Sequence, residues 1–187
     1  MNRLAFPSLP AAGPAAWVLR PPDPGDGAAL HDLIKHCPPL DLNSCYAYLL
    51  HGLHFADTCV LAERDGRPHA YVSAYLPPGR PDTLFVWQVA VHQAARGQGL
   101  ARRLLDHLLA RPACCAVRWL ETTVSPGNEP SARLFRGLAR HRGCPCTVTE
   151  LFHADLFGTA AHDAELLFRL GPFSTPSTPD TGASPCK

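Results

Sequence analysis

The stretch Gln88-Val89-Ala90-Val91-His92-Gln93-Ala94-Ala95-Arg96-Gly97-Gln98-Gly99-Leu100-Ala101 decides the fold class of this 187-residue chain. It starts in the most strand-like run of the sequence, 83–91, and enters an amphipathic run that predicts a helix over 99–110. The two glycines let backbone N–H groups approach an oxygen-rich ligand without a Cβ clash. The helix start adds a partial positive charge. The stretch therefore predicts an anion-binding loop between a strand and a helix.

The glycine spacing of this loop is also compatible with a loop that binds no ligand. Two glycines suit a plain strand–helix turn that needs backbone freedom, and the Gly-x-Gly pattern alone does not separate the two. No Gly-Lys-Ser/Thr follows, which excludes a P-loop, and no third glycine or acidic residue on the next strand completes a dinucleotide fingerprint. The rest of the sequence must therefore be used to distinguish a plain turn from a loop that binds a ligand.

The elements on both sides of the loop indicate a mixed sheet. Apolar periodicity predicts strands at 17–20, 58–63, 69–76, 83–91, 117–124, 146–152 and 165–170, and helices at 24–36, 43–53, 99–110 and 130–141. Asp65-Gly66 predicts a tight hairpin between two of the strands. Three adjacent strands followed by alternating strands and helices favour a mixed sheet in an α/β fold over a doubly wound fold.

Composition narrows the function classes. The chain is 46% apolar and carries a formal charge of +1, which fits one globular domain without a dominant nucleic-acid or anionic-membrane surface. No apolar run is long enough to span a membrane, and prolines interrupt the site of a signal peptide, so we expect an intracellular protein. The predicted folded unit is 17–172, with flexible tails at 1–16 and 173–187.

The cysteines do not predict a metal site. For an intracellular chain, the eight cysteines are expected to be reduced thiols. The clusters that could suggest a metal lack the paired Cys-x-x-Cys spacing of structural zinc sites. These clusters are Cys114-Cys115, Cys144-Pro145-Cys146 and His51-x-x-His54.

Three residues in apolar surroundings are candidates for chemistry. Glu121, within Trp-Leu-Glu-Thr-Thr-Val, is either paired, facing solvent or functional, and strand alternation favours the solvated position. Asp41, within Leu-Asp-Leu, either caps the following helix or contacts an ammonium group. Trp87 is either a core residue or a pocket wall that faces a cationic amine.

The central loop, with a following strand and a helix that carries Asn128 and Phe135, resembles the GCN5-related N-acetyltransferases, the GNAT family. The resemblance implies a GNAT fold, with a mixed, mostly antiparallel sheet and helices on both faces, and acetyl-coenzyme A as co-substrate. It also implies that the backbone N–H of Val89 polarises the thioester carbonyl. The implied cofactor-binding residues are Val89, Val91, Arg96, Gly97, Gln98, Gly99, Leu100, Ala101, Asn128 and Phe135.

A narrower resemblance, to the branch of this family that acetylates L-2,4-diaminobutyrate in ectoine biosynthesis, covers about 18–172. It is carried by Leu40-Asp41-Leu42-Asn43-Ser44, Tyr46-Ala47-Tyr48-Leu49-Leu50, Phe85-Val86-Trp87-Gln88-Val89-Ala90-Val91, Leu120-Glu121-Thr122-Thr123-Val124 and His162-Asp163-Ala164-Glu165. It implies direct transfer to the 4-amine, a cytoplasmic homodimer, and Glu121 as general base. The implied substrate-binding residues are Asp41, Tyr46, Trp87, Glu121, Thr123 and His162.

Some alternatives stay open at this point. Many GNAT members carry a tyrosine as proton donor where this chain has Phe135, so the leaving-group acid is not assigned. Tyr46 also fits ordinary helix packing, and His162 fits a solvated side chain. The two rival functions are an acetyltransferase for another small amine and a non-catalytic module that binds acyl-coenzyme A. The balanced charge disfavours a nucleic-acid binder.

Overall fold

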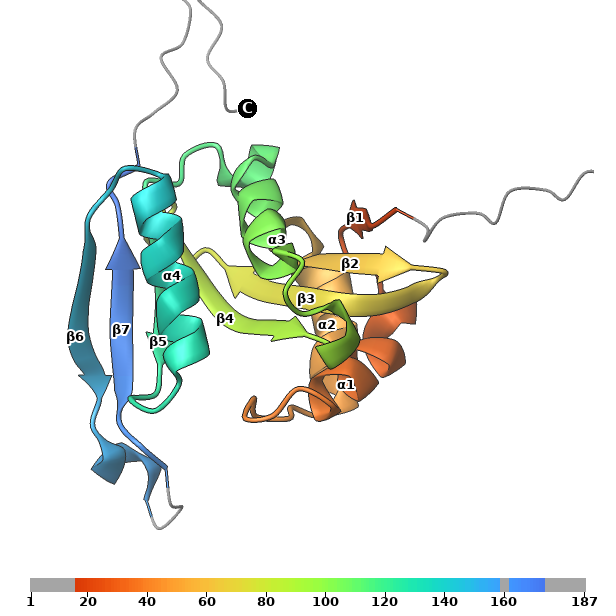
Figure 1. Ribbon diagram of the computed structural model, residues 1–187, viewed down its shortest axis with the longest axis horizontal. Coiled ribbons are helices and arrows are strands. Elements are labelled where there is room, and N and C mark those ends of the chain that lie inside the picture. Colours follow the sequence, from red (N-terminus) through yellow and green to blue (C-terminus); the bar gives the residue numbers. More distant parts are fainter. Residues whose placement is uncertain (1–15, 159–161, 174–187) are drawn as a thin grey trace, which may run out of the picture.

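The seven strands follow the order β1-β2-β3-β4-β5-β7-β6 across one sheet (Figure 1). The structure is a computed structural model that describes residues 16–158 and 162–173. The predicted tails therefore lie outside the described residues, apart from residues 16 and 173. The strands are β1 (Val18–Arg20), β2 (Val60–Arg64), β3 (Arg67–Tyr75), β4 (Thr83–Val91), β5 (Trp119–Val124), β6 (Cys146–Phe152) and β7 (Glu165–Leu170).

Four α-helices in the described part of the chain cover the two faces of this sheet (Figure 1). Helices α1 and α2 pack on one face, where Leu30 and Tyr48 meet Leu61 of β2. Helices α3 and α4 pack on the other face. The β4–β5 pair is parallel and the other pairs are antiparallel, which confirms the predicted fold class. The helices are α1 (Gly27–Lys35), α2 (Cys45–His54), α3 (Leu100–Leu109) and α4 (Glu129–His141).

Local signals in the sequence set several of these boundaries. The bounds of β4, β6 and β7 are those predicted. Ser44 caps α2, because its Oγ accepts a hydrogen bond from the Ala47 N–H at 3.3 Å, so the interpretation of Asp41 as the cap is wrong. Asp65 and Gly66 have φ of 54° and 70°, the positive values that a tight type I′ hairpin needs.

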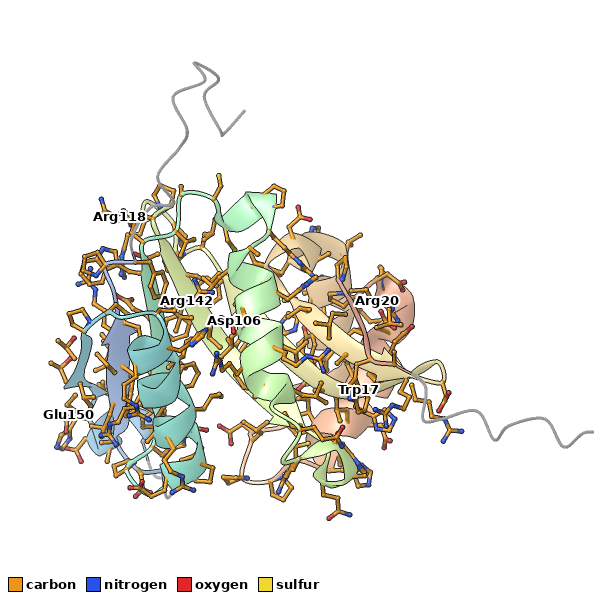
Figure 2. All side chains as sticks on the ribbon, turned by 45° about the horizontal axis from the view of Figure 1, so that its top comes forward. Trp17, Arg20, Asp106, Arg118, Arg142 and Glu150 are labelled. Atoms are coloured by element: carbon orange, nitrogen blue, oxygen red, sulfur yellow. The ribbon has the colours of Figure 1, made fainter. Side chains whose placement is uncertain are left out.

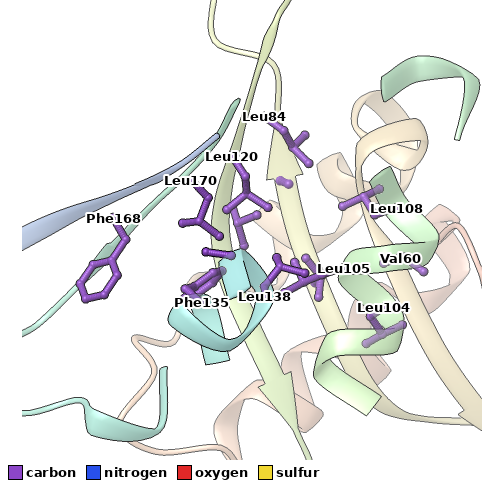
Figure 3. Packing of buried hydrophobic residues seen from close by; sticks show 14 of the residues in the cluster. Val60, Leu84, Leu104, Leu105, Leu108, Leu120, Phe135, Leu138, Phe168 and Leu170 are labelled. Atoms are coloured by element: carbon purple, nitrogen blue, oxygen red, sulfur yellow. The ribbon is translucent and has the colours of Figure 1, made fainter. Parts of the chain in front are cut away.

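The larger core lies between the sheet and the helices α3 and α4. Figure 3 shows leucines of α3 packed against aliphatic side chains of the central strands. The amphipathic pattern predicted for the helix at 99–110 is confirmed, because the leucines of α3 that face the sheet, Leu100, Leu104, Leu105 and Leu108, are buried. The side chains labelled in this cluster are Val60, Leu84, Leu104, Leu105, Leu108, Leu120, Phe135, Leu138, Phe168 and Leu170.

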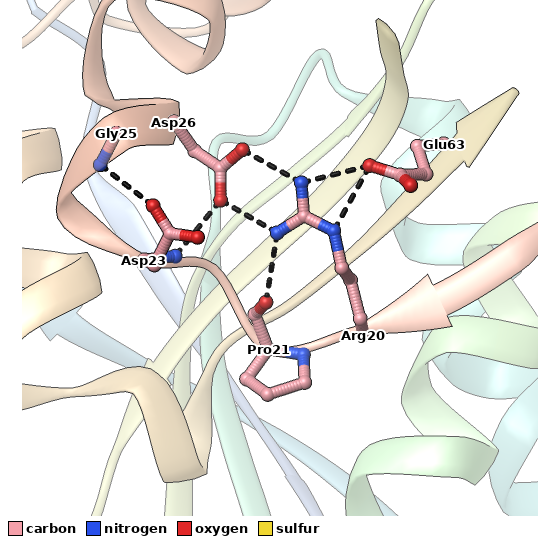
Figure 4. Close-up of polar contacts among 6 residues, drawn as sticks. All are labelled: Arg20, Pro21, Asp23, Gly25, Asp26 and Glu63. Carbon is pink, nitrogen blue, oxygen red and sulfur yellow. Dashed lines mark hydrogen bonds and ion pairs between the residues drawn. The ribbon is translucent and has the colours of Figure 1, made fainter. Parts of the chain in front are cut away.

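Charged side chains tie neighbouring elements together. The Arg20 guanidinium lies 2.7 Å from a carboxylate oxygen of Asp26 and 2.7 Å from one of Glu63 (Figure 4). It thereby joins β1, the turn before α1, and β2, and its hydrogen bond lowers the pKa of Asp26. Between α3 and α4, Arg142 donates to Asp106 at 2.8 Å (Figure 2).

Trp87 is the extra residue of a β-bulge in β4. Ser73 of β3 pairs with Gln88, while the next residue, Ala74, pairs with Val86. Trp87 therefore has no partner opposite it across this ladder. An extra residue of this kind bends a strand and increases its twist.

The bulge changes the direction in which successive residues of β4 point. Val86 packs in the core beneath α3 and α4, whereas Ala90, four residues further, packs in the core beneath α1 and α2. Between them, Trp87 and Gln88 both contact side chains of α2. Two successive side chains thus face the same side of the sheet.

The strands β4 and β5 separate beyond the bulge. Their parallel pairing runs from Thr83 opposite Trp119 to Val86 opposite Thr122, and Figure 1 shows the two strands running apart after it. The second half of β4 therefore keeps β3 as its paired neighbour while its other side faces a gap.

The remaining expectations concern membranes, metals and thiols. No helix within the described ranges is long and apolar enough to cross a membrane. The described residues also contain no group of three His, Cys, Asp or Glu side chains that could hold a metal ion. Cys115 is disulfide-bonded, so the expectation of eight reduced thiols is wrong for this residue. Free thiols are present at Cys37, Cys45, Cys59, Cys114, Cys144 and Cys146.

Candidate active site

A first pocket, of about 370 Å³, lies beside the second half of β4. The loop before α2, the strand β4, the start of α3 and the start of α4 each contribute to it. Its walls are mostly apolar and include a few polar or charged side chains. The lining residues are Cys37, Pro38, Pro39, Leu40, Val89, Val91, Arg96, Ala101, Asn128, Pro130, Ser131 and Leu134.

The glycine loop at one end of this pocket has the features of an anion site. Gly97 and Gly99 have φ of 76° and 69°, a left-handed conformation that L side chains rarely adopt. Helix α3 starts after Gly99 without a side-chain cap, whereas Asn128 caps α4 by accepting from the Ser131 N–H at 3.2 Å. The first N–H groups of α3 therefore remain available to an anionic ligand.

The backbone of β4 faces the pocket as well. The His92 N–H donates to the His69 carbonyl at 2.8 Å, and along antiparallel strands such pairs alternate with non-hydrogen-bonded pairs. Val91 and Val89 therefore occupy the positions whose N–H and C=O groups point away from β3, toward the gap beside β5. In agreement, the Val91 carbonyl accepts a hydrogen bond from Arg96 Nε at 3.1 Å.

A second pocket, of about 640 Å³, adjoins the first. The two share Pro39, Leu40 and Asn128, so a ligand in one lies next to a ligand in the other. Acidic side chains and hydrogen-bond donors are concentrated in this second pocket. Its lining residues are Pro39, Leu40, Asp41, Asn43, Trp87, Gln88, Thr123, Val124, Ser125, Gly127, Asn128, Phe152, Phe157, His162, Asp163 and Glu165.

Three of the charged or titratable groups meet across the second pocket. The His162 Nε2 lies 3.9 Å from Asp41 Oδ2 and 4.0 Å from Glu165 Oε1. The Ser125 hydroxyl donates to Glu165 at 2.9 Å, and the Phe157 ring stacks on the imidazole with centroids 3.8 Å apart. The Glu165 side chain is only 16% exposed, so its carboxylate is held at one position in the wall.

Trp87 forms part of the second pocket through the bulge in β4. Its side chain is 50% exposed, and its ring meets His51 edge to face with centroids 5.6 Å apart. The interpretation of Trp87 as a core residue is therefore wrong, and the structure places the indole where a pocket wall was predicted. Thr123, at the end of β5, lies in the same pocket.

Glu121 has a different environment from the one predicted. Its side chain is 6% exposed, and its Oε1 lies 2.5 Å from Arg80 Nη2 and 3.4 Å from Arg169 Nε. The solvated interpretation is thus wrong, because two guanidinium groups pair with the carboxylate. Glu121 lines neither of the two pockets, and its role as general base stays a prediction.

Several other predicted residues also lie outside both pockets. Tyr46 is 66% exposed on α2, whereas Phe135 and Leu100 are buried in the larger core. Gly97, Gln98 and Gly99 are exposed in the loop ahead of α3, where the predicted anion contacts come from the backbone and not from side chains.

Sequence reasoning missed other polar groups of the second pocket. Glu165 belonged to the string around His162, but its spacing alone did not distinguish it from an ordinary strand residue. The other missed residues are Asn43, Gln88, Ser125 and Asp163.

A comparison with known families decides the assignment. The acetyltransferase (GNAT) family matches residues 27–139, which span the cofactor-type loop and the strand and helices around it. The chain belongs to the GNAT family of acetyltransferases.

Individual relatives narrow the assignment within the GNAT family. The L-2,4-diaminobutyric acid acetyltransferase of Bordetella parapertussis is 54% identical over 174 residues, which cover 91% of this chain and 94% of the relative. The enzyme of the same description from Halomonas elongata is 47% identical and covers 84% and 82% of the two chains.

A solved GNAT structure agrees with these relatives. The diaminobutyrate acetyltransferase of Paenibacillus lautus, in complex with its substrate L-2,4-diaminobutyric acid and coenzyme A, is similar with a TM-score of 0.84 at 44% identity. It covers 88% of this chain and 99% of that one. The predicted resemblance to the diaminobutyrate acetyltransferases is confirmed.

Proposed function

We propose that this chain transfers the acetyl group of acetyl-coenzyme A to the 4-amine of L-2,4-diaminobutyrate. The observation that carries the proposal is that the two pockets share a wall. The first pocket adjoins the predicted anion-binding loop, and the second pocket is rich in carboxylates. The diaminobutyrate acetyltransferases among the relatives, at up to 54% identity, support the same substrate.

The first pocket fits acetyl-coenzyme A. The uncapped start of α3 and Arg96 supply N–H groups and a positive charge for the pyrophosphate. The backbone of Val89 and Val91 supplies donors and acceptors for the amides of the pantetheine arm. In this assignment Gly97, Gln98, Gly99, Leu100 and Ala101 form the phosphate loop, and the Asn128 amide lies near the cofactor arm.

The second pocket fits a small diamino acid. Two ammonium groups need acceptors, which Asp41, Asp163 and Glu165 supply. A carboxylate needs donors, which the Thr123 hydroxyl and the Asn43 amide supply. The Trp87 indole gives a face on which a cationic amine is stabilised by about 0.5–2 kcal/mol.

In the proposed reaction, a C–N bond forms to the 4-amine and the C–S bond of the thioester breaks, and coenzyme A leaves as its thiol with the proton that the attacking nitrogen gives up. The amine is bound protonated and must lose a proton before it attacks. The Val89 N–H polarises the carbonyl, a contribution of about 3–4 kcal/mol for a single well-placed donor. Between the two candidate bases, the geometry favours Glu165, which faces the pocket, over Glu121, which is paired with two arginines.

We also infer a cytoplasmic homodimer that acts in ectoine biosynthesis. The resemblance to the diaminobutyrate acetyltransferases supports all three parts of this inference. Exposed apolar side chains on and next to α2 are consistent with a covered face in a dimer. These side chains are Tyr46, Leu49, Leu53 and Phe55.

The experiment that tests the function is product analysis with the purified protein. Diaminobutyrate and acetyl-coenzyme A should give a mono-acetylated product by mass spectrometry, with the acetyl group on the 4-nitrogen by NMR. Ornithine, lysine and diaminopropionate, tested in parallel, should react at least tenfold more slowly. Faster reaction with one of these would assign a different amine, and binding of acetyl-coenzyme A without turnover on any amine would indicate a non-catalytic module.

A further inference from the structure

The loop between α1 and α2 forms most of the wall that the two pockets share. Pro39 and Leu40 line both pockets, and Asp41 and Asn43 line the second. Residues 38–43 form neither helix nor strand, and the hydrogen bond from the Leu40 N–H to the Cys37 carbonyl is local. The position of this loop therefore sets how a ligand in one pocket lies relative to a ligand in the other.

Two buried side chains, Gln88 of β4 and Tyr48 of α2, hold the loop. The Gln88 amide nitrogen donates to the backbone carbonyl of Asp41 at 2.7 Å, and the Tyr48 hydroxyl donates to the Gln88 amide oxygen at 3.3 Å. The Asp41 end of segment 41–43 is thus tied to one pair of residues.

The buried polar groups of Tyr48 and Gln88 are used to hold the loop. Tyr48 is 0% exposed and Gln88 is 4% exposed, so each polar group needs a partner within the protein. One orientation of the Gln88 amide satisfies both neighbours, because the Asp41 carbonyl can only accept and therefore faces the NH₂ group. Burial raises the pKa of Tyr48, which keeps its hydroxyl protonated as a donor at neutral pH.

The bulge in β4 explains why Gln88 can reach the loop. It turns Gln88 and the preceding Trp87 toward the same side of the sheet, the side that carries α2. Trp87 then forms part of the wall of the second pocket, while Gln88 holds loop 38–43. One backbone irregularity thereby positions two sides of the second pocket.

We propose that Gln88 and Tyr48 are a positioning pair that fixes loop 38–43 against β4 and so aligns the amine with the acetyl donor. Both polar atoms of the Gln88 side chain are used by Tyr48 and Asp41, so it acts through the loop and not on the reacting atoms. The inference rests on the proposed function for its kinetic consequence. Its structural content, the clamped loop, can be measured separately.

Three variants test the pair. Tyr48→Phe removes one hydroxyl and keeps the buried ring, and Gln88→Met keeps the length of the side chain and removes both hydrogen bonds. Tyr75→Phe is the matched control, since this half-buried tyrosine on β3 packs against Phe85 with ring centroids 5.3 Å apart and lies outside both pockets. A thermal melt of each variant verifies folding before kinetics.

The expected kinetic result is a split between the two substrates. The KM for diaminobutyrate should rise about tenfold in Tyr48→Phe and Gln88→Met, as the loss of a positioning hydrogen bond predicts, and the KM for acetyl-coenzyme A about threefold or less. The double variant should resemble Gln88→Met alone, because either loss releases the same loop. Tyr75→Phe should behave as the parent protein.

Hydrogen exchange gives the second readout. Amides of 40–43 should exchange faster in both variants than in the parent protein and in Tyr75→Phe, while amides of β3 should stay unchanged. Unchanged exchange at 40–43 in both variants would overturn the proposal, as would parent-like kinetics in the double variant. If the parent protein fails to acetylate diaminobutyrate, the proposed function fails and the exchange result still decides whether the pair clamps the loop.

Discussion

The Nε2 atom of His162 lies 3.9 Å from Oδ2 of Asp41, although one residue stands just before β7 and the other just before α2. The two residues reach each other because β5 has β7 as its neighbour on one side and separates from β4 on the other. A carboxylate from the first half of the chain and an imidazole from the last strand connection thereby face one pocket. Glu165 adds a second carboxylate at 4.0 Å from the same imidazole.

Removal of the Asp41 charge should weaken binding of the amine substrate. We expect Asp41→Asn to raise the KM for diaminobutyrate about tenfold, a moderate effect because this carboxylate is 88% exposed and screened by water. The KM for acetyl-coenzyme A should change little. Asp32→Asn, at an exposed position on α1, is the control in steady-state kinetics. Equal KM values for Asp41→Asn and the control would exclude a contact between Asp41 and the substrate.

Removal of the Glu165 charge should affect turnover itself. Glu165 is partly buried, accepts from Ser125 and faces the second pocket, so Glu165→Gln should lower kcat/KM about a hundredfold or more. Glu150→Gln on β6 is the matched control, because Glu150 is exposed and outside both pockets (Figure 2). Steady-state kinetics of both variants should show this loss only in Glu165→Gln.

Glu121→Gln completes this comparison. Because Glu121 pairs with Arg80 and Arg169, we expect the variant to lose about 1–3 kcal/mol of unfolding free energy while turnover falls less than tenfold. Denaturant unfolding and kinetics on the same preparation measure both. A strong loss of turnover in Glu121→Gln with parent-like turnover in Glu165→Gln would instead assign the base to Glu121.

Substitution of Gly99, which precedes α3, should weaken binding of the acetyl donor and leave binding of the amine unchanged. Gly99→Ala places a side chain at φ 69°, which costs about 1–2 kcal/mol and displaces the first N–H groups of the helix. Its KM for acetyl-coenzyme A should rise at least fivefold. Gly79→Ala has the same kind of strain at φ 76° in open space, away from both pockets. Calorimetric titration with coenzyme A should separate the two variants; equal affinities would exclude a role of the α3 start in phosphate binding.

Stability should fall as the pH falls through the titration of histidine. Burial lowers the pKa of His51, whose ring packs among aromatic side chains and whose Nδ1 lies 3.0 Å from the Tyr71 hydroxyl. Below the unfolded value of about 6.5, the unfolded chain binds a proton that the folded chain resists, so stability is lost toward lower pH. His51→Gln should reduce the slope of the unfolding free energy against pH by up to about 1.4 kcal/mol per pH unit.

The exposed His54, on the same helix, provides the control for this slope. His54→Gln should leave the difference in unfolding free energy between pH 7.5 and pH 5.5 unchanged, as measured by urea unfolding at each pH. A parent-like slope in His51→Gln would show that other groups cause the acid sensitivity. His69 and His107 are the other described histidines whose pKa is lowered by burial.

Local patterns in the sequence were sufficient for most of the fold. The β-branched and aromatic run of β4 gave its bounds, and the leucine spacing of α3 gave its buried face. The bulge at Trp87 could not be predicted, because it depends on how β3 pairs with β4. For the same reason the direction of Trp87 was left open between core and pocket.

The candidate site was predicted less completely, since its groups meet only through the topology. The anion-binding loop at Arg96 was predicted from a local glycine and helix-start pattern, whereas the role of Val89 came from the family resemblance, and both roles stay predictions. Strand alternation favoured a solvated Glu121, because it contains no information about Arg80, and only the family resemblance indicated a catalytic role for this residue. Glu165 was overlooked because its neighbour Ser125 belongs to another part of the chain.

The early end of the β4–β5 ladder has a consequence for how this enzyme class can diversify. Past Val86, β4 offers its main chain to whatever lies in the gap, and amide groups present the same donors and acceptors whatever side chains they carry. Under the proposed function, recognition of acetyl-coenzyme A would be insensitive to side-chain substitution along this segment. The proposed amine pocket, in contrast, depends on its side chains, so substitutions there could change the acceptor amine while the acyl donor stays the same.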